Sequence, residues 1–195
     1  MIGIILAAGR GSRLKTHTED SPKCLTTLHG KTLLDWQIEA MEKARVHEIV
    51  AVTGYMEQML ASKREILTRV NADWSSTNMV SSLCIASDIL TASAAIVSYS
   101  DIIYPAEAVS MLIKADSDIA ITYDVNWLDL WQLRFKDPLE DAESFRLDSE
   151  NFVSEIGLKA TSVDQIQGQY MGLLKFKPEG WCKVKQFLNR YSPMQ

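Results

Sequence analysis

The chain has 195 residues, of which 47% are hydrophobic and 23% charged, as in an ordinary globular protein with a sizeable core. Its net charge of −5 argues against a general nucleic-acid-binding surface. Scattered cysteines without CxxC spacing, and the lack of an apolar run of the ~20 residues that span a membrane, exclude a disulfide framework, a zinc knot and membrane insertion. Since a strand pattern follows Met1 directly, we expect a cytoplasmic protein without a signal peptide.

The first part of the chain alternates short apolar strands with amphipathic helices. Ile2–Ala7 is a continuous, β-branched-rich run, typical of a strand buried on both faces of a parallel sheet. Further strands are expected at Glu48–Thr53, Ala94–Tyr99 and Ile119–Tyr123, and helices at Thr32–Ala44, Met56–Val70, Val80–Leu90 (with an N-cap from Ser75–Thr77) and Ala106–Lys114. This alternation predicts an α/β fold: a Rossmann-like, mostly parallel sheet flanked by helices.

Beyond about Asp124 the pattern changes to shorter strands joined by acidic turns. We expect these strands at Gln132–Lys136, Ser144–Leu147, Phe152–Ile156 and Tyr170–Phe176, before a last helix at Pro178–Arg190. No linker separates independent domains. We therefore predict a single domain over residues 1–195, with halves 1–124 and 125–195, the second of them β-rich.

A glycine-rich, basic loop, LAAGRGSRL, covers residues 6–14. A dinucleotide fold would need a third glycine and an acidic strand end ~20 residues later, and neither is present. Gly30-Lys31-Thr32 imitates the end of a P-loop, but the first glycine of that motif is missing. What remains is a nest of backbone N–H groups that, with arginines added, can hold phosphate oxygens. Lys23, after Pro22, offers a compact cation toward the same place.

The complete pattern resembles the signature of the nucleotidyltransferases that make nucleoside-diphospho compounds. That signature runs LAAGxGxRL, a spacer, PK with an apolar pair, and Gly-Lys before a Leu-rich helix. LAAGRGSRL, SPKCL (Ser21–Leu25) and HGKTLL (His29–Leu34) match it here. Later blocks resemble the phosphocholine cytidylyltransferase branch: Gly54-Tyr55, NMVSSL (Asn78–Leu83), Ser100-Asp101, RFKDPLEDAESF (Arg134–Phe145), Glu155-Ile156-Gly157 and IQGQYMGLLKF (Ile166–Phe176).

The resemblance implies a Mg²⁺-dependent transfer of CMP from CTP to phosphocholine or a similar phosphorylated or phosphonate small molecule, with release of pyrophosphate. Residues 1–124 would bind the nucleoside triphosphate, and residues 125–195 would bind the phosphorylated acceptor. No nucleic acid is expected as a partner. Two alternatives stay open: a sugar-1-phosphate nucleotidylyltransferase that uses UTP, dTTP or GTP, and a nucleotide-binding module without turnover.

The resemblance also implies roles for particular residues. Arg13 would pair with the outer phosphates, and Lys23 would stabilise charge that grows at the α-phosphate. Asp101 ends a strand at the carboxyl edge of the sheet, where sites in open α/β folds lie, and is the expected Mg²⁺ ligand. Asp116 and Asp118 precede their strand and are expected as solvated turn residues at the opposite edge. The nucleotide would contact Leu6, Ala7, Ala8, Gly9, Gly11, Ser12, Gly54, Asn78 and Ser82.

The acceptor is expected on the segments after the fourth strand. Asp124 with Trp127, Arg134 and Tyr170 would suit an ammonium group through cation–π attraction, although Trp127 and Trp131 are also spaced for core packing. The remaining tryptophans are expected in the core or as loop anchors: Trp36, Trp74 and Trp181. Family members usually continue through a further strand whose acidic segment supplies a second metal ligand. We expect this chain to be shortened before it.

Overall fold

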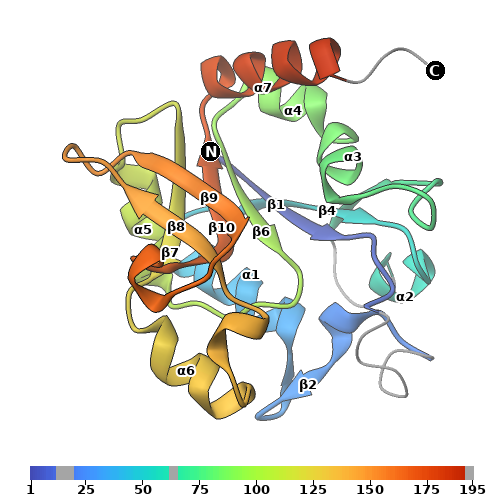
Figure 1. Ribbon diagram of the computed structural model, residues 1–195. Coiled ribbons are helices and arrows are strands. Elements are labelled where there is room, and N and C mark those ends of the chain that lie inside the picture. Colours follow the sequence, from blue (N-terminus) through green and yellow to red (C-terminus); the bar gives the residue numbers. More distant parts are fainter. Residues whose placement is uncertain (12–19, 62–65, 192–195) are drawn as a thin grey trace. The chain divides into compact units, whose positions relative to one another are not determined.

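The computed structural model describes residues 1–11, 20–61 and 66–191 (Figure 1). The chain divides into two compact units: unit 1 comprises Met1–Ala120 and Gly172–Gln195, and unit 2 comprises Ile121–Met171. A single domain over residues 1–195, with halves 1–124 and 125–195, stays a prediction. Within the described ranges, no helix is long and apolar enough to cross a membrane.

Unit 1 is built on a mostly parallel sheet with β1 (Ile2–Ala7) in its interior. β1 pairs in parallel with β4 (Glu48–Thr53) on one side and with β6 (Ala95–Tyr99) on the other. β5 (Leu67–Val70) extends the sheet in parallel beyond β4, whereas β10 (Gln169–Phe176) runs antiparallel to β6. The strand order of the six-stranded sheet is β5-β4-β1-β6-β10-β7, where β7 (Ile119–Asp124) begins in unit 1 and ends in unit 2. The predicted α/β fold with a mostly parallel sheet is confirmed.

Successive side chains of β1 point to opposite faces of the sheet, and both sets are buried because helices cover both faces. Ile5 belongs to one core cluster and Ile4 to the other. Figure 1 shows α3, α4 and α7 together on one side of the sheet. The first cluster is covered by α1 (Leu33–Lys43), α2 (Glu57–Ala61) and α5 (Ala106–Lys114), and the second by α3 (Met79–Cys84), α4 (Ser87–Ala92) and α7 (Pro178–Tyr191).

The segment between β1 and α1 is fastened to the first core cluster. It contains a 3₁₀ turn, η2 (Lys23–Leu25), and a short hairpin of β2 (Thr27–Leu28) and β3 (Lys31–Thr32). Cys24 and Leu25 are buried in the cluster that α1 covers. Thr32 caps α1 in a reciprocal capping box with Asp35. The position of Lys23 is therefore tied to the first turn of α1.

Unit 2 combines one α-helix with an antiparallel hairpin. The helix is α6 (Trp127–Arg134), and the hairpin consists of β8 (Glu143–Leu147) and β9 (Val153–Lys159). Short turns, η3 (Pro138–Glu140) and η4 (Val163–Gln165), connect these elements. The core cluster of this unit is formed by Trp127, Ala142, Ala160 and Ile166.

Most predicted elements of unit 1 are confirmed to within one residue at each end, but the predicted helix Met56–Val70 is wrong. The structure has the short helix α2 and then β5, which pairs with β4 at the sheet edge. Thr68 and Val70 are β-branched and suit an extended edge strand, so pairing with β4 overrides the helical spacing of the apolar residues.

Two further predictions are corrected. The expected strand Gln132–Lys136 is largely the last turn of α6, since Trp127 and Trp131 lie one helical turn apart and both pack on the core of unit 2. The expected helix Val80–Leu90 is divided into α3 and α4, and its N-cap is Asn78 rather than a residue of Ser75–Thr77.

Candidate active site

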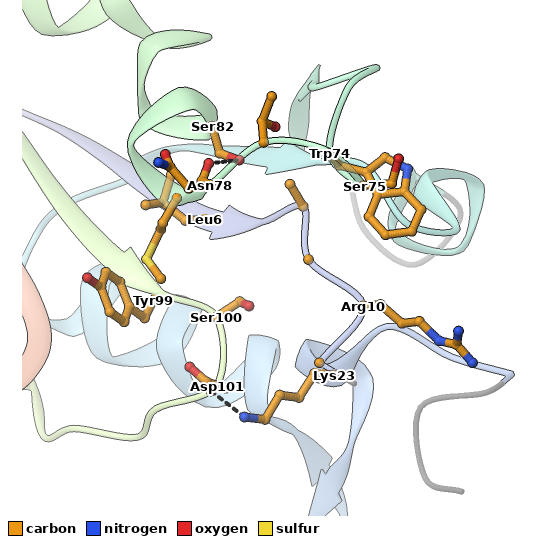
Figure 2. Close-up of a pocket in the computed structure, with 15 residues that line it drawn as sticks. Leu6, Arg10, Lys23, Trp74, Ser75, Asn78, Ser82, Tyr99, Ser100 and Asp101 are labelled. Carbon is orange, nitrogen blue, oxygen red and sulfur yellow. Dashed lines mark hydrogen bonds and ion pairs between the residues drawn. The ribbon is translucent and has the colours of Figure 1, made fainter. Parts of the chain in front are cut away.

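A pocket of about 540 Å³ lies in unit 1, where β1 and β6 end (Figure 2). Four segments that are distant in the sequence form its wall: the loop after β1, the turn η2, the start of α3 with the loop before it, and the turn after β6. This is the carboxyl edge of the parallel sheet, where ligands bind in open α/β folds. The lining residues are Leu6, Ala8, Gly9, Arg10, Gly11, Lys23, Trp74, Ser75, Thr77, Asn78, Met79, Ser82, Tyr99, Ser100 and Asp101.

The glycine-rich loop packs directly against the side chain of Lys23. Gly11 has φ +73°, and a Cβ there would stand 3.0 Å from both Cβ and Cδ of Lys23. Only glycine combines that backbone conformation with so close an approach at little cost. A Cβ on Gly9, by contrast, would have no atom of the described residues within 4 Å, so this side of the loop opens into the pocket.

Lys23 and Asp101 form an ion pair inside the pocket, drawn as a dashed line in Figure 2. The lysine comes from η2, and the aspartate from the turn after β6. Their side chains keep 28% and 35% exposure, so both charged groups remain accessible to a molecule that enters the pocket. One cation and one carboxylate are thus presented side by side next to the glycine-rich loop.

A buried asparagine organises the polar wall of the pocket. Asn71, 3% exposed, donates from Nδ2 to the hydroxyls of Thr77 and Ser82 at 3.0 and 3.1 Å. Asn78 accepts from the Ser81 backbone N–H at 3.0 Å and thereby caps α3. The Ser82 hydroxyl accepts from Asn71 and the Asn78 side-chain oxygen accepts from Ser81. These bonds fix the orientations of Ser82 and Asn78 before any ligand arrives.

An aromatic wall closes the pocket beside the glycine-rich loop. Trp74 packs edge-on against Tyr55 with ring centroids 5.3 Å apart, and the Arg10 guanidinium lies 5.7 Å from the Tyr55 ring centroid. Tyr55 N–H donates to the Ala8 carbonyl at 2.9 Å. A Cβ on Gly54 would approach Trp74 Cβ to 2.6 Å and the Ala8 carbonyl oxygen to 2.8 Å. Gly54 therefore allows the tryptophan and the loop to meet.

Residues 3–144 match the family model of the MobA-like NTP transferase domain. The chain belongs to this nucleotidyltransferase family. A CTP:phosphoglutamine cytidylyltransferase of Campylobacter jejuni is 40% identical over 96% of this chain and 77% of its own length. A choline-phosphate cytidylyltransferase of Streptococcus pneumoniae is 37% identical over 33% of this chain and 28% of its own length.

A solved structure of the CTP:phosphocholine cytidylyltransferase from Streptococcus pneumoniae matches this nucleotidyltransferase with a TM-score of 0.71. The match covers 97% of this chain and 76% of the other, at 19% identity, and so shows the shared fold. The predicted family and enzyme class are confirmed.

The structure brings together most of the predicted nucleotide-contacting residues of this nucleotidyltransferase. Ala7 is 2% exposed in the core under the loop, and Gly54 lies behind Trp74; neither lines the pocket. Ser12 and Arg13 lie outside the described residues. Among all the predicted site residues, including the catalytic and metal-binding candidates, those that line the pocket are Leu6, Ala8, Gly9, Gly11, Lys23, Asn78, Ser82 and Asp101. Their roles stay predictions.

Sequence reasoning missed part of the pocket, above all Trp74. Trp36 and Trp181 fit the expected packing roles, with Trp36 Nε1 donating to the Leu28 carbonyl at 2.9 Å and Trp181 fully buried. Trp74 instead lines the pocket. Its position could have indicated this, because Trp74 lies in a loop that follows a strand at the carboxyl edge of the sheet, where ligands bind in open α/β folds. The other missed lining residues are Arg10, Ser75, Thr77, Met79, Tyr99 and Ser100.

The donor set of the nucleotidyltransferase pocket fits a metal that is shared with a nucleotide. In residues 1–11, 20–61 and 66–191, no group of three or more His, Cys, Asp or Glu converges to hold an ion. Among the described lining residues, Asp101 alone offers a carboxylate, and Mg²⁺ is commonly held by one or two carboxylates together with phosphate oxygens and water. Asp101 could therefore hold Mg²⁺ together with a bound triphosphate.

Asp116 and Asp118, which were expected as solvated turn residues, lie elsewhere on unit 1. Asp116 pairs with Lys177 at 2.9 Å and Asp118 with Lys183 at 2.7 Å. The hydrogen bond from each lysine lowers the pKa of its carboxyl partner below the usual value. Neither aspartate lines the pocket, so the two surface ion pairs can be compared with the ion pair of Lys23 and Asp101.

The predicted acceptor residues all belong to unit 2. Asp124 accepts from the Asn126 N–H at 2.8 Å in the turn before α6, and Tyr170 is half-buried. Trp127 is 3% exposed and donates from Nε1 to the Ile166 carbonyl at 3.3 Å, which places its ring in the core. Arg134 is exposed, with its guanidinium 5.1 Å from the ring centroid of Trp131. Their contact with an acceptor stays a prediction.

Proposed function

We propose that the chain is a cytidylyltransferase that transfers CMP from CTP to a phosphorylated, nitrogen-containing small molecule and releases pyrophosphate. The observation that carries this proposal is the 40% identity to a CTP:phosphoglutamine cytidylyltransferase, because it extends over 96% of the chain. The match therefore spans the segments that form the wall around Asn78 and unit 2 as well as the glycine-rich loop.

In the proposed reaction, a phosphate oxygen of the acceptor attacks the α-phosphorus of CTP. A new P–O bond forms, the bond from the α-phosphorus to the oxygen that bridges to the β-phosphorus breaks, and pyrophosphate leaves with that electron pair. Both substrates are polyanions, so the protein's main task is to neutralise charge as they meet. Backbone N–H groups of Ala8–Gly11 hold the triphosphate, and Arg13 pairs with its outer phosphates.

Lys23 is the proposed catalytic cation and Asp101 the proposed Mg²⁺ ligand. The position of the Lys23 side chain supports the catalytic role, because it is packed against Gly11 of the loop and remains 28% exposed. Mg²⁺, when bound, would neutralise phosphate charge. Once a triphosphate enters, the Lys23 ammonium group leaves the Asp101 carboxylate and binds phosphate oxygens. The carboxylate is then available to Mg²⁺.

The base and the acceptor are assigned to two further groups of residues. Asn78 and Ser82, held by the α3 cap and by Asn71, offer hydrogen bonds to the edge of a pyrimidine. For the acceptor we retain Asp124, Arg134 and Tyr170 of unit 2, with Trp127 as the core residue that supports α6. The acceptors named for the two sequence relatives, phosphoglutamine and choline phosphate, share a phosphate and a nitrogen-containing body.

Pyrophosphate release tests the proposal directly. CTP, UTP, dTTP and GTP are each combined with phosphoglutamine, phosphocholine, 2-aminoethylphosphonate and a sugar 1-phosphate, with magnesium or with a chelator, and Lys23→Ala as the inactive control. Turnover restricted to CTP and a nitrogen-containing acceptor supports the proposal. Turnover of a sugar 1-phosphate with another nucleotide would replace it by the sugar-1-phosphate alternative. Tight nucleotide binding without pyrophosphate release in any combination would favour a module without turnover.

A further inference from the structure

A glutamine amide is buried in the middle of α1. Gln37 has no exposed surface and lies on the same helix face as Leu34 and Ile38, in an otherwise apolar cluster. Its Nε2 donates to the Ile102 carbonyl at 2.8 Å, and its Oε1 accepts from the Ser98 hydroxyl at 3.0 Å. Both ends of the amide are therefore satisfied, which offsets the cost of burying it.

The two partners of Gln37 stand on either side of Asp101 in the chain. Ser98 belongs to β6, whereas Ile102 follows the aspartate in the turn that leaves the sheet. β6 ends at Tyr99, so the backbone beyond it has lost the regular hydrogen bonds of the sheet. The bond to the Ile102 carbonyl replaces one of them and fixes the turn that carries Asp101.

The same helix also holds Lys23. Cys24 and Leu25 of η2 are buried in the core cluster that contains Leu34 and Ile38 of α1. The Leu33 N–H donates to the Thr26 carbonyl at 3.0 Å, which joins the residue after η2 to the first residue of α1. α1 is thus a common support: it holds the lysine through η2 and the aspartate through Gln37.

We propose that Gln37 is a positioning residue for nucleotidyl transfer, which sets the place of the Asp101 carboxylate relative to Lys23 through the Ile102 carbonyl and the Ser98 hydroxyl. The proposal rests on the proposed function, in which Asp101 binds Mg²⁺. If Gln37 served packing only, another side chain of the same length could replace it. Methionine fills a similar space but has no hydrogen-bond donor and no strong acceptor. The amide bonds are therefore what the test removes.

The test compares Gln37→Met with Leu90→Val, which alters a fully buried side chain in the cluster on the other face of the sheet. Thermal unfolding identifies temperatures at which both variants are folded. Mn²⁺, as a spectroscopic substitute for Mg²⁺, is then titrated into each protein with a non-hydrolysable CTP analogue, and kcat is measured at saturating Mg²⁺. We expect weaker Mn²⁺ binding for Gln37→Met and a fall in kcat of up to about 100-fold, the effect of a misplacement of about 1 Å.

Two further variants make the result decisive. Ser98→Ala removes one of the two amide bonds, so it should change Mn²⁺ affinity in the same direction but less, and add little in the Gln37→Met background. This variant also provides the readout should Gln37→Met fail to fold. Asp101→Asn tests the proposed function itself.

The outcomes separate the two proposals. If Asp101→Asn loses Mn²⁺ affinity while Gln37→Met and Ser98→Ala behave like Leu90→Val, Gln37 has a packing role only and the proposed function stands. If Asp101→Asn binds Mn²⁺ as the unaltered protein does, the metal assignment and the positioning role of Gln37 are both overturned.

Discussion

Lys23 and Asp101 are 78 residues apart in the sequence and form an ion pair in the pocket of unit 1. With both side chains about one-third exposed, such a pair contributes little to folding, on the order of 0–1 kcal/mol. Under the proposed function, its arrangement serves the ligand, because a triphosphate and its metal would each take one member of the pair. The surface pair of Lys183 and Asp118 has the same chemistry away from the pocket and provides matched controls.

Lys23→Ala should suppress turnover far more than nucleotide binding. The ammonium group is proposed to act as charge grows at the α-phosphate, and loss of one such stabilising group typically costs about 10²- to 10³-fold in kcat. The checks are kcat at saturating substrates and the CTP dissociation constant by calorimetry. Lys183→Ala should change neither quantity. Equal losses of binding and turnover in Lys23→Ala would assign the lysine to ground-state binding instead.

Asp101→Asn should weaken the response of activity to magnesium without weakening the binding of metal-free CTP. The variant loses the proposed carboxylate ligand, so more Mg²⁺ should be needed for half-maximal activity. It also releases Lys23 from its ion pair, so binding of metal-free CTP should be as tight as in the unaltered protein or tighter. A magnesium titration and a binding titration in chelator measure the two effects, with Asp118→Asn as control. An unchanged magnesium titration would exclude Asp101 as a ligand.

The sequence predicts the centre of unit 1 well because its signals are local. β1 is buried on both faces and reads as a continuous apolar run, and Gly11 reflects a left-handed backbone conformation. The elements that were predicted wrongly depend on distant partners: β5 is extended because it pairs with β4, and α6 is helical where its tryptophans pack on the core of unit 2. Trp74 was missed for the same reason, since its contact with Tyr55 and its close approach to Gly54 come from the folded chain.

Gly9→Ala and Gly11→Ala should affect different properties, although both add one methyl group to the same loop. At Gly11 the methyl meets the Lys23 side chain and φ is +73°, so stability should fall by about 1–2 kcal/mol and turnover should fall with it. At Gly9 the methyl has space, so stability should hold while CTP affinity falls, because the methyl group occupies the space that a phosphate would enter. Denaturant unfolding and CTP titration check the two expectations. Loss of stability in Gly9→Ala without loss of affinity would mean that the loop does not hold the phosphates.

Cys24 should make folding stability decline in alkaline solution. Burial raises the pKa of this thiol from 9.0 to about 12, so between these pH values the folded protein retains a proton that the unfolded chain loses. Its contribution to stability is complete below pH 9.0 and is lost as the pH rises through the folded value of about 12, at up to about 1.4 kcal/mol per pH unit. Denaturant unfolding at a series of pH values measures the decline.

Cys24→Ala should flatten this decline, whereas Cys182→Ala, at an exposed position, should leave it unchanged. Some decline remains in both variants, because burial also raises the pKa of Tyr104. Thiol alkylation gives an independent check: Cys84 and Cys182 are exposed and should react in the folded protein, while Cys24 should react only on unfolding. Rapid labelling of Cys24 in the folded state would show that η2 is not held against α1, and would remove the basis for the fixed position of Lys23.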